Sequence, residues 1–297
     1  MYPAAFAYHR VESVDAAVAL LGEHEDAKLL AGGHSLLPMM KLRLAQPEVL
    51  VDIGRLPLDG VGAGPDGLTV GALATHHRVA TSADVMGRWQ AFAEAAASIG
   101  DPIVRNHGTA GGNVAHADPA SDLPAALLAL DGELRATGLD GARHVPAAGF
   151  FQGLLTTALE PAEVLTELRL PAPGPRAGSA YLKFEHPASG FAVCGAAAVV
   201  ELDADGRCAR ARLCFNGVTE VPLDAGAVAA ALAGSGLDDS AIEQAVGDCL
   251  LVEEPLADTF ASGEYRTHLA RVYARRALRA ARDRAGTAGD PADGAVG

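Results

Sequence analysis

Two glycine pairs, far apart in the sequence, constrain the fold of this chain more than any other feature. The first follows the apolar run of residues 29–31, which ends at Gly32-Gly33, and residues 36–44 then have helical character. This pattern predicts a strand, a tight turn and the start of a helix. Glycines at such a turn permit positive φ and leave no Cβ in front of the amides, so an anionic group can approach the N–H donors. Ser35 can cap the helix or bond a phosphate oxygen.

The second glycine pair belongs to Thr109-Ala110-Gly111-Gly112-Asn113, in a stretch without clear periodicity. Together with Gly108 it offers three glycines and a threonine hydroxyl within five residues, which predicts a nest of backbone donors and not a packing surface. Two such nests suit a ligand with two phosphates. Neither glycine pair lies in a Gly-x-x-x-x-Gly-Lys-Ser/Thr motif or in a Gly-x-Gly-x-x-Gly motif followed by the usual acidic residue. A different dinucleotide-binding fold is therefore expected.

Charge and apolar runs limit the classes of partner. A formal net charge of −14 opposes nucleic-acid binding, because phosphate neutralisation requires a basic surface. No run approaches the roughly 18 apolar residues of a membrane span, and the N-terminus lacks a basic region followed by an apolar core. We therefore expect a cytoplasmic protein. The four cysteines form no Cys-x-x-Cys pair, so we expect reduced, partly buried thiols and no metal site in this chain.

The order of the expected elements indicates an α+β chain with several domains. Residues 1–57 read as a small βαβαβ lobe, and residues 58–175 as a second lobe of strands and helices. Three prolines and a glycine within residues 171–175 mark the clearest boundary. Residues 176–285 then read as an antiparallel sheet followed by helices, and the composition of residues 286–297 predicts a disordered tail.

Three polar clusters have more than one interpretation. Residues 75–78, Thr-His-His-Arg, favour a surface or capping role over a metal site, because adjacent histidines point in different directions. Asp122 is placed to bond amides at the start of the apolar helix of residues 123–130. Arg271, Arg275 and Arg279 form a basic stripe, which indicates a solvated face or an acidic partner subunit.

Four motifs together carry a family resemblance. They are Ala31-Gly32-Gly33-His34-Ser35-Leu36, Pro38-Met39-Met40-Lys41-Leu42-Arg43-Leu44, Arg105-Asn106-His107-Gly108-Thr109-Ala110-Gly111-Gly112-Asn113 and Ala117-Asp118-Pro119-Ala120-Ser121-Asp122-Leu123-Pro124. In these motifs the chain resembles the FAD-binding medium subunit of molybdenum hydroxylases, the carbon monoxide dehydrogenase and xanthine dehydrogenase family. The resemblance extends from Phe6 to about Arg282.

The resemblance implies a fold and a cofactor. The fold would be α+β, a two-lobed FAD-binding fold of the vanillyl-alcohol-oxidase/PCMH type followed by a C-terminal domain with an antiparallel sheet and a helical bundle. FAD would be held non-covalently, its pyrophosphate against the two glycine motifs. The cofactor-binding residues expected from the motifs and the resemblance are Leu29, Leu30, Ala31, Gly32, Gly33, His34, Ser35, Leu36, Ile99, Thr109, Ala110, Gly111, Gly112, Asn113, Asp122, Leu165 and Lys183.

Three of these roles are implied by the resemblance alone. Ile99 and Leu165 would flank the nucleotide or ring, and Asp122 would contact the flavin nucleotide. Lys183 would approach the flavin from the third domain, where a cation stabilises an anionic reduced flavin, although a solvated strand lysine is the alternative. Many relatives have an arginine and then an acidic residue after this lysine, where the present chain has His186 and Gly190.

The resemblance also implies partners and a role. A large subunit would hold the molybdenum cofactor, a small subunit two [2Fe-2S] clusters, and the whole would be a dimer of heterotrimers. This chain would take electrons from the clusters and pass them to an external acceptor, a quinone, NAD or oxygen. It contains no evident catalytic residues or metal ligands of its own. A self-contained flavin oxidase of the same architecture and a flavin-free scaffold subunit are the alternatives.

Overall fold

The first lobe is a small parallel sheet with two helices. The structure is a computed structural model that describes residues 2–287. The lobe consists, in chain order, of β1 (Ala7–Arg10), α1 (Val14–Glu23), β2 (Lys28–Leu30), α2 (Leu36–Lys41) and β3 (Val49–Asp52). Strand β3 lies between β1 and β2, and both pairings are parallel, which confirms the predicted βαβαβ lobe. Ser13 caps α1 by accepting from the amide of Ala16, as its position predicts.

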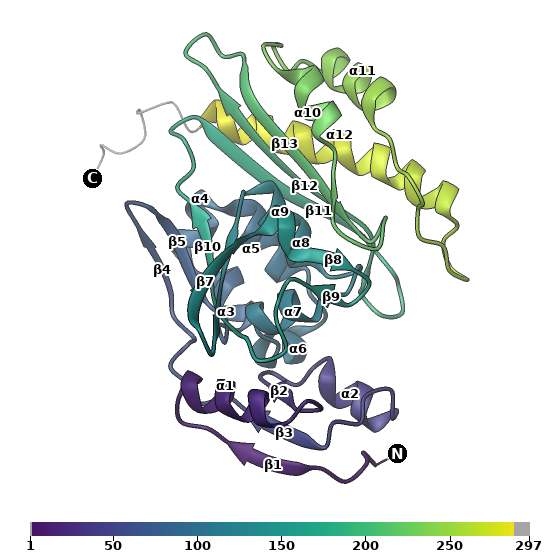
Figure 1. Cartoon of the computed structure of the whole chain (residues 1–297). Helices are drawn as coiled ribbons and strands as arrows, with labels where there is room; N and C mark the ends of the chain where they lie inside the picture. The colour runs from purple at the N-terminus through teal and green to yellow at the C-terminus, as the bar shows by residue number, and fades with distance from the viewer. Residues whose placement is uncertain (1, 288–297) are drawn as a thin grey trace.

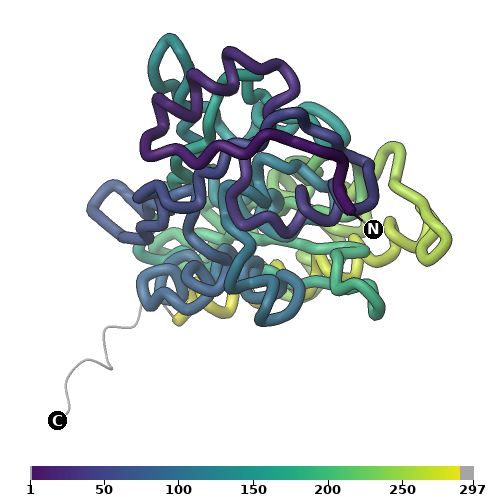
Figure 2. The backbone as a smooth tube through the Cα atoms, turned by 90° about the horizontal axis from the view of Figure 1, so that it is seen from below, coloured from purple at the N-terminus to yellow at the C-terminus, as the bar shows by residue number. Residues whose placement is uncertain are grey.

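The middle lobe is built on an antiparallel sheet of strand order β4-β5-β10-β6-β7 (Figure 1). Its strands are β4 (Val61–Gly64), β5 (Gly67–Gly71), β6 (Glu133–Gly138), β7 (Gly141–Pro146) and β10 (Val164–Pro171). Its other elements are α3 (His76–Thr81), α4 (Ala83–Arg88), α5 (Gln90–Ala97), α6 (Pro102–His107), α7 (Ala110–His116), α8 (Asp122–Ala129), α9 (Ala147–Phe150), β8 (Phe151–Gly153) and β9 (Thr156–Thr157). Figure 2, seen from below, shows the first lobe lying across the base of this lobe.

The C-terminal domain is an antiparallel sheet of order β11-β12-β13-β14 with a long helix along one face (Figure 1). It contains β11 (Ala177–Glu185), β12 (Ala192–Leu202), β13 (Cys208–Asn216), β14 (Leu223–Asp224), α10 (Gly226–Leu232), α11 (Asp239–Cys249) and α12 (Gly263–Thr287). The predicted α+β architecture, two lobes followed by a sheet with helices, is confirmed. Helix α12 includes the first two residues of the predicted tail, and residues 288–297 lie outside the described part of the chain.

The C-terminal sheet is covered on both faces, which brings the middle lobe and the last domain together. Helix α12 packs on β11 and β12, whereas α5 and α8 of the middle lobe pack on the opposite face. Alternate residues of β12 therefore enter different cores: Ala197 packs with α5 and α8, and Ala198 with α12. Helix α8, buried along its whole length, is apolar after Asp122 because it packs between the C-terminal sheet and the helices α5, α7 and α9.

Two of the three arginines in the basic stripe on α12 form ion pairs within the chain. Arg275 pairs with Glu243 of α11, and Arg279 pairs with both Asp239 and Glu243. An acidic partner subunit is therefore not needed to explain these two arginines. Among the described residues, none of the helices combines the length and the apolarity that a bilayer crossing demands.

Candidate FAD-binding site

The first glycine pair forms the predicted turn between β2 and α2. Gly33 has a φ of +74°, which a residue with a side chain rarely adopts. Within residues 2–287, the amides of Gly33, His34 and Ser35 donate no hydrogen bond to the chain. Ser35 precedes α2 without a side-chain capping bond, so of its two predicted roles capping is not observed. The turn therefore presents three amides and an exposed hydroxyl to a ligand.

The second glycine motif has a different local structure from the predicted donor nest. It begins helix α7, and Thr109 caps that helix by accepting from the amide of Gly112. The amides of Ala110 and Gly111 donate to the carbonyls of Ala74 and Ala72, each at 2.8 Å. The prediction of free backbone donors here was wrong, because the segment that precedes α3 accepts these bonds.

Close packing explains Gly111. A Cβ on Gly111 would lie 2.4 Å from the Cβ of Ala72, so this glycine permits contact between α7 and the segment after β5. Gly112, in contrast, is exposed. One glycine of the pair therefore serves packing, and the other leaves backbone accessible.

The two motifs converge, as a shared ligand requires. A Cβ on Gly32 would lie 2.1 Å from the carbonyl oxygen of His107 and 3.0 Å from the Cα of Gly108. A Cβ on Gly112 would lie 4.0 Å from the Cβ of Ala31. Figure 1 shows α6 at the edge of the middle lobe that faces β2 and α2. The predicted convergence of the two glycine turns is therefore confirmed.

Two buried polar atoms near the motifs, Asn113 Oδ1 and His76 Nδ1, have no hydrogen-bond partner among residues 2–287. The Asn113 amide nitrogen donates to the Ser121 hydroxyl at 3.3 Å, but its Oδ1 is buried without a hydrogen bond within the described residues. Buried polar atoms are almost always paired, so this atom indicates an interaction still to be made.

A histidine cluster lies where the two motifs meet. The rings of His34 and His107 stand edge to face, with 5.6 Å between centroids. His76 is 3% exposed, and its amide donates to the Gly108 carbonyl at 3.0 Å. Thr75 caps α3 as predicted, but His76 is not at the surface, contrary to that part of the interpretation. The pKa of His76 is lowered to about 4, mainly by burial and in smaller part by the charges of His34 and Arg105.

This buried histidine predicts acid sensitivity. The pKa of His76 is lower in the folded than in the unfolded state, so the unfolded chain binds more protons between about pH 4 and 6.5, and stability falls as the pH falls through that window. We expect the free energy of unfolding to drop by about 2 kcal/mol from this group between pH 7 and pH 5. Urea denaturation of His76→Gln at both pH values should show a smaller drop. Exposed His24→Gln is the control, and equal drops in both variants would contradict the prediction.

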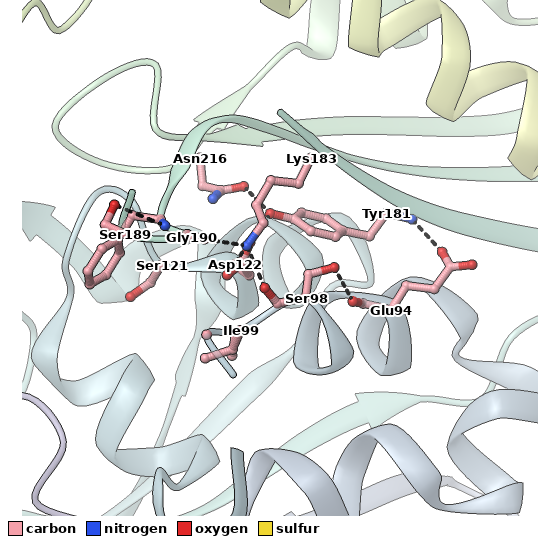
Figure 3. A network of polar contacts seen from close by, with 12 residues as sticks. Glu94, Ser98, Ile99, Ser121, Asp122, Tyr181, Lys183, Ser189, Gly190 and Asn216 are labelled. Atoms are coloured by element: carbon pink, nitrogen blue, oxygen red, sulfur yellow. Dashed lines mark hydrogen bonds and ion pairs between the residues drawn. The ribbon is translucent and has the colours of Figure 1, made fainter. Parts of the chain in front are cut away.

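Asp122 and Lys183 form a buried ion pair (Figure 3). Each side chain is 5% exposed, and the Lys183 ammonium lies 3.1 Å from Oδ1 and 3.3 Å from Oδ2 of the carboxylate. Lys183 also donates to the carbonyls of Ser98, at 2.5 Å, and Gly190, at 2.9 Å. The Tyr181 hydroxyl donates to Asp122 Oδ1 at 2.6 Å. Burial raises the pKa of Asp122 and outweighs the opposing effects of Lys183 and Tyr181.

These contacts correct one prediction and qualify another. Asp122 is the first residue of α8, but its carboxylate bonds Tyr181 and Lys183 and does not cap the helix. Lys183 is not a solvated strand lysine. Its three hydrogens are matched by Asp122 and by the carbonyls of Ser98 and Gly190.

The remaining predicted residues are apolar. Ile99, 9% exposed, follows α5, and Leu165, 5% exposed, belongs to β10; both join the core of the middle lobe. Leu29 and Leu30 belong to β2, which delivers the chain to the first turn. A cavity of about 610 Å³ beside the β4–β5 turn and residues 131–133 contains none of the predicted residues.

The chain matches two family models, which together span most of its length. Residues 4–173 match the FAD binding domain in molybdopterin dehydrogenase. Residues 179–281 match the CO dehydrogenase flavoprotein C-terminal domain. The chain belongs to the FAD-binding medium subunits of the molybdenum hydroxylases. It is an oxidoreductase subunit of the carbon monoxide dehydrogenase and xanthine dehydrogenase type, and FAD is the cofactor of the matched domain.

Similar proteins agree with this membership along nearly the whole chain. The carbon monoxide dehydrogenase medium chain of Afipia carboxidovorans is 40% identical over 288 residues, 96% of this chain and 99% of that protein. In a solved carbon monoxide dehydrogenase from Hydrogenophaga pseudoflava, one chain superposes with a TM-score of 0.90 at 42% identity, covering 96% of this chain and 99% of its own length. Quinoline 2-oxidoreductase from Pseudomonas putida 86 also superposes with a TM-score of 0.90, at 30% identity, covering 98% and 100%.

Proposed function

We propose that this medium subunit takes electrons from the [2Fe-2S] clusters of a small subunit and passes them to an external acceptor, with bound FAD supplying the redox chemistry. Substrate would be oxidised at the molybdenum cofactor of a large subunit. The assembly would be a dimer of heterotrimers, and a cytoplasmic location remains a prediction. The observation that carries the proposal is the convergence of Gly32 on the carbonyl of His107, which joins the two motifs into one ligand-facing surface.

The residues present fit a dinucleotide. The amides of Gly33, His34 and Ser35 would bind the pyrophosphate together with the Ser35 hydroxyl. Asn113 has a buried oxygen without a partner among residues 2–287, which would accept a hydroxyl hydrogen of the ligand. Because the amides of residues 110–113 are already bonded, this motif would contact FAD through the exposed backbone of Gly112 and through its side chains.

Asp122, Lys183, Ile99 and Leu165 would have supporting roles. The Asp122 carboxylate and the Lys183 ammonium are bonded to each other, so we propose that they fix the wall of the site, and that direct contact with the flavin would require one of their present bonds to be shared. Ile99 and Leu165 would supply apolar contacts to the nucleotide or ring.

The substrate is proposed to lie outside this chain. Two similar structures carry the names of different substrates, carbon monoxide and quinoline, yet each superposes on this chain with a TM-score of 0.90. The same subunit fold in enzymes with different substrates favours an electron-transfer role for this subunit over the alternative of a self-contained flavin oxidase. Alone and loaded with FAD, the chain should not oxidise organic substrates; turnover by the isolated chain would favour the oxidase.

The decisive experiment is purification of the native complex with analysis of flavin, iron and molybdenum. We expect FAD on this chain, and iron and molybdenum on two other subunits. Absence of flavin from the complex would favour the scaffold alternative and contradict the proposal. A complex with flavin but without iron or molybdenum would contradict the proposed electron donors.

Ser35→Ala tests the first turn directly. Loss of a hydrogen bond to a charged phosphate should weaken FAD binding by about 10- to 100-fold, measured by titrating the apoprotein with FAD and following flavin fluorescence. Ser82→Ala is the matched control, because Ser82 also precedes a helix without a side-chain capping bond. Equal affinity in the two variants would remove Ser35 from the site.

A further inference from the structure

A buried chain of polar groups joins the C-terminal sheet to helix α8 (Figure 3). Tyr181 of β11 is 4% exposed, and its hydroxyl lies 2.6 Å from Asp122 Oδ1 and 3.1 Å from the side-chain amide of Asn216 on β13. Asn216 is 2% exposed, and its Nδ2 has no partner within the described residues when Oδ1 faces Tyr181. Three buried polar side chains thus meet between β11, β13 and the start of α8.

The hydrogen bonds among Asn216, Tyr181 and Asp122 have a definite direction. The Tyr181 hydroxyl has one hydrogen and cannot donate to both Asp122 and an Asn216 oxygen. Turning the Asn216 amide over, so that Nδ2 donates to Tyr181, pairs the otherwise unpaired nitrogen and leaves the hydroxyl hydrogen for Asp122. The bonds then run from Asn216 to Tyr181 to Asp122, with one hydrogen donated at each step.

The sheet makes room for this contact at Gly195. Gly195 of β12 pairs with Lys183 on one side and Asn216 on the other. A Cβ on Gly195 would lie 2.2 Å from both the Tyr181 hydroxyl and Asn216 Oδ1. A strand interior normally disfavours glycine, so its presence here matches a need for close approach.

The chain of bonds ends beside the proposed FAD site. Ser121, next to Asp122, accepts from the amide of Asn113 in the second glycine motif. Lys183, held by Asp122, bonds the carbonyl of Ser98 and that of Gly190, whose Cβ position lies 3.9 Å from the Cα of Gly100. A change at Tyr181 would therefore reach residues on both sides of the α6–α7 segment.

We propose that Tyr181 is a positioning residue, which holds the Asp122 carboxylate ionised and in place so that Lys183 can fix residues 98–100 and the turn at Gly190 around bound FAD. This inference rests on the proposed function. It adds Tyr181 and Asn216, which neither the motifs nor the resemblance identify.

The charges facing Asp122 determine the expected pH dependence. Lys183 and the Tyr181 hydroxyl favour its ionised form, and Glu185 of β11 disfavours it. The Ser98 carbonyl, which follows α5, bonds Lys183 and has no proton to exchange. Removing the Tyr181 hydroxyl removes one stabilising bond, so Asp122 would take up a proton at a higher pH. Lys183 would then lose its counter-charge, and FAD would be released at a higher pH.

Tyr181→Phe tests this proposal in the full chain loaded with FAD. We follow flavin fluorescence while the pH is lowered and record the acid limb, the pH range over which FAD is released. We expect this limb to lie about one to two pH units higher in Tyr181→Phe. Tyr273→Phe is the matched control, because among residues 2–287 the Tyr273 hydroxyl makes no hydrogen bond. Coincident curves for wild type, Tyr181→Phe and Tyr273→Phe would overturn the proposal.

Two further variants separate positioning from a general loss of structure. In an Asp122→Asn background, which cannot titrate, Tyr181→Phe should cause no additional shift; a further shift there would overturn the proposal. Asn216→Ala leaves Tyr181 intact and should move the limb in the same direction, which provides the test if Tyr181→Phe does not fold. Failure of the wild type to bind FAD at any pH would instead contradict the proposed function.

Discussion

Gly32→Ala is expected to release FAD and to separate the first lobe from α6. The added Cβ would lie 2.1 Å from the His107 carbonyl oxygen, and both partners are backbone, so relief requires one turn to move away from the other. Overpacking of this kind costs about 1 to 3 kcal/mol of folding stability. The larger effect falls on the ligand, because a dinucleotide held by both motifs needs them at a fixed separation. We expect FAD affinity to fall by more than about 100-fold.

The measurement is the ratio of flavin to protein absorbance after desalting, together with urea denaturation with and without FAD. Gly62→Ala is the control, because the Cβ position of this strand glycine has nothing within 4 Å. If Gly32→Ala retained FAD as well as Gly62→Ala does, the two motifs would not share one ligand. Loss of FAD with an unchanged free energy of unfolding would mean that the turn moves without strain to the lobe.

The two glycine motifs differ in how far local sequence could predict them. The turn at Gly32-Gly33 is local, because a strand end, two glycines and a helix start follow one another, and its free amides follow from that geometry. The amides of Ala110 and Gly111 are bonded to carbonyls of residues 72 and 74. Those acceptors come from a distant segment, and no pattern around Gly111-Gly112 reveals them. Free donors can therefore be predicted from sequence only where no other segment competes for them.

The family resemblance implies that Asp122 contacts the flavin nucleotide, which stays a prediction, whereas the helix-capping role expected from its local position is wrong. A carboxylate at a helix start normally bonds amides, and nothing near it in sequence indicates a buried lysine from β11. A usable signal did exist on that strand. Tyr181 and Lys183 are two residues apart, so they share one face of β11, and two polar groups on a face that packs against helices indicate a buried network. Asn216 could be linked to them only through the sheet register.

Lys183→Met is expected to destabilise the fold by about 3 to 5 kcal/mol, the usual cost of removing one partner of a buried ion pair. Methionine keeps much of the side-chain volume, so the cost comes from polar groups left behind: the Asp122 carboxylate and the carbonyls of Ser98 and Gly190. Exposed Lys28→Met is the control and should change the free energy of unfolding by less than about 0.5 kcal/mol. Urea denaturation at pH 7 measures both.

Adding Asp122→Asn to Lys183→Met should restore part of the loss, because the amide carries no charge to bury. The double variant should cost less than the sum of the single variants by about 1 to 3 kcal/mol. The pH dependence has a definite sign. Without Lys183 the pKa of Asp122 is raised further, so the folded state binds more protons than the unfolded state. Lys183→Met should therefore be most destabilised near pH 7 and recover as the pH falls towards 5. Additive losses, or a penalty that does not change with pH, would mean that Asp122 is already protonated in the wild type and that Lys183 acts only through the two carbonyls.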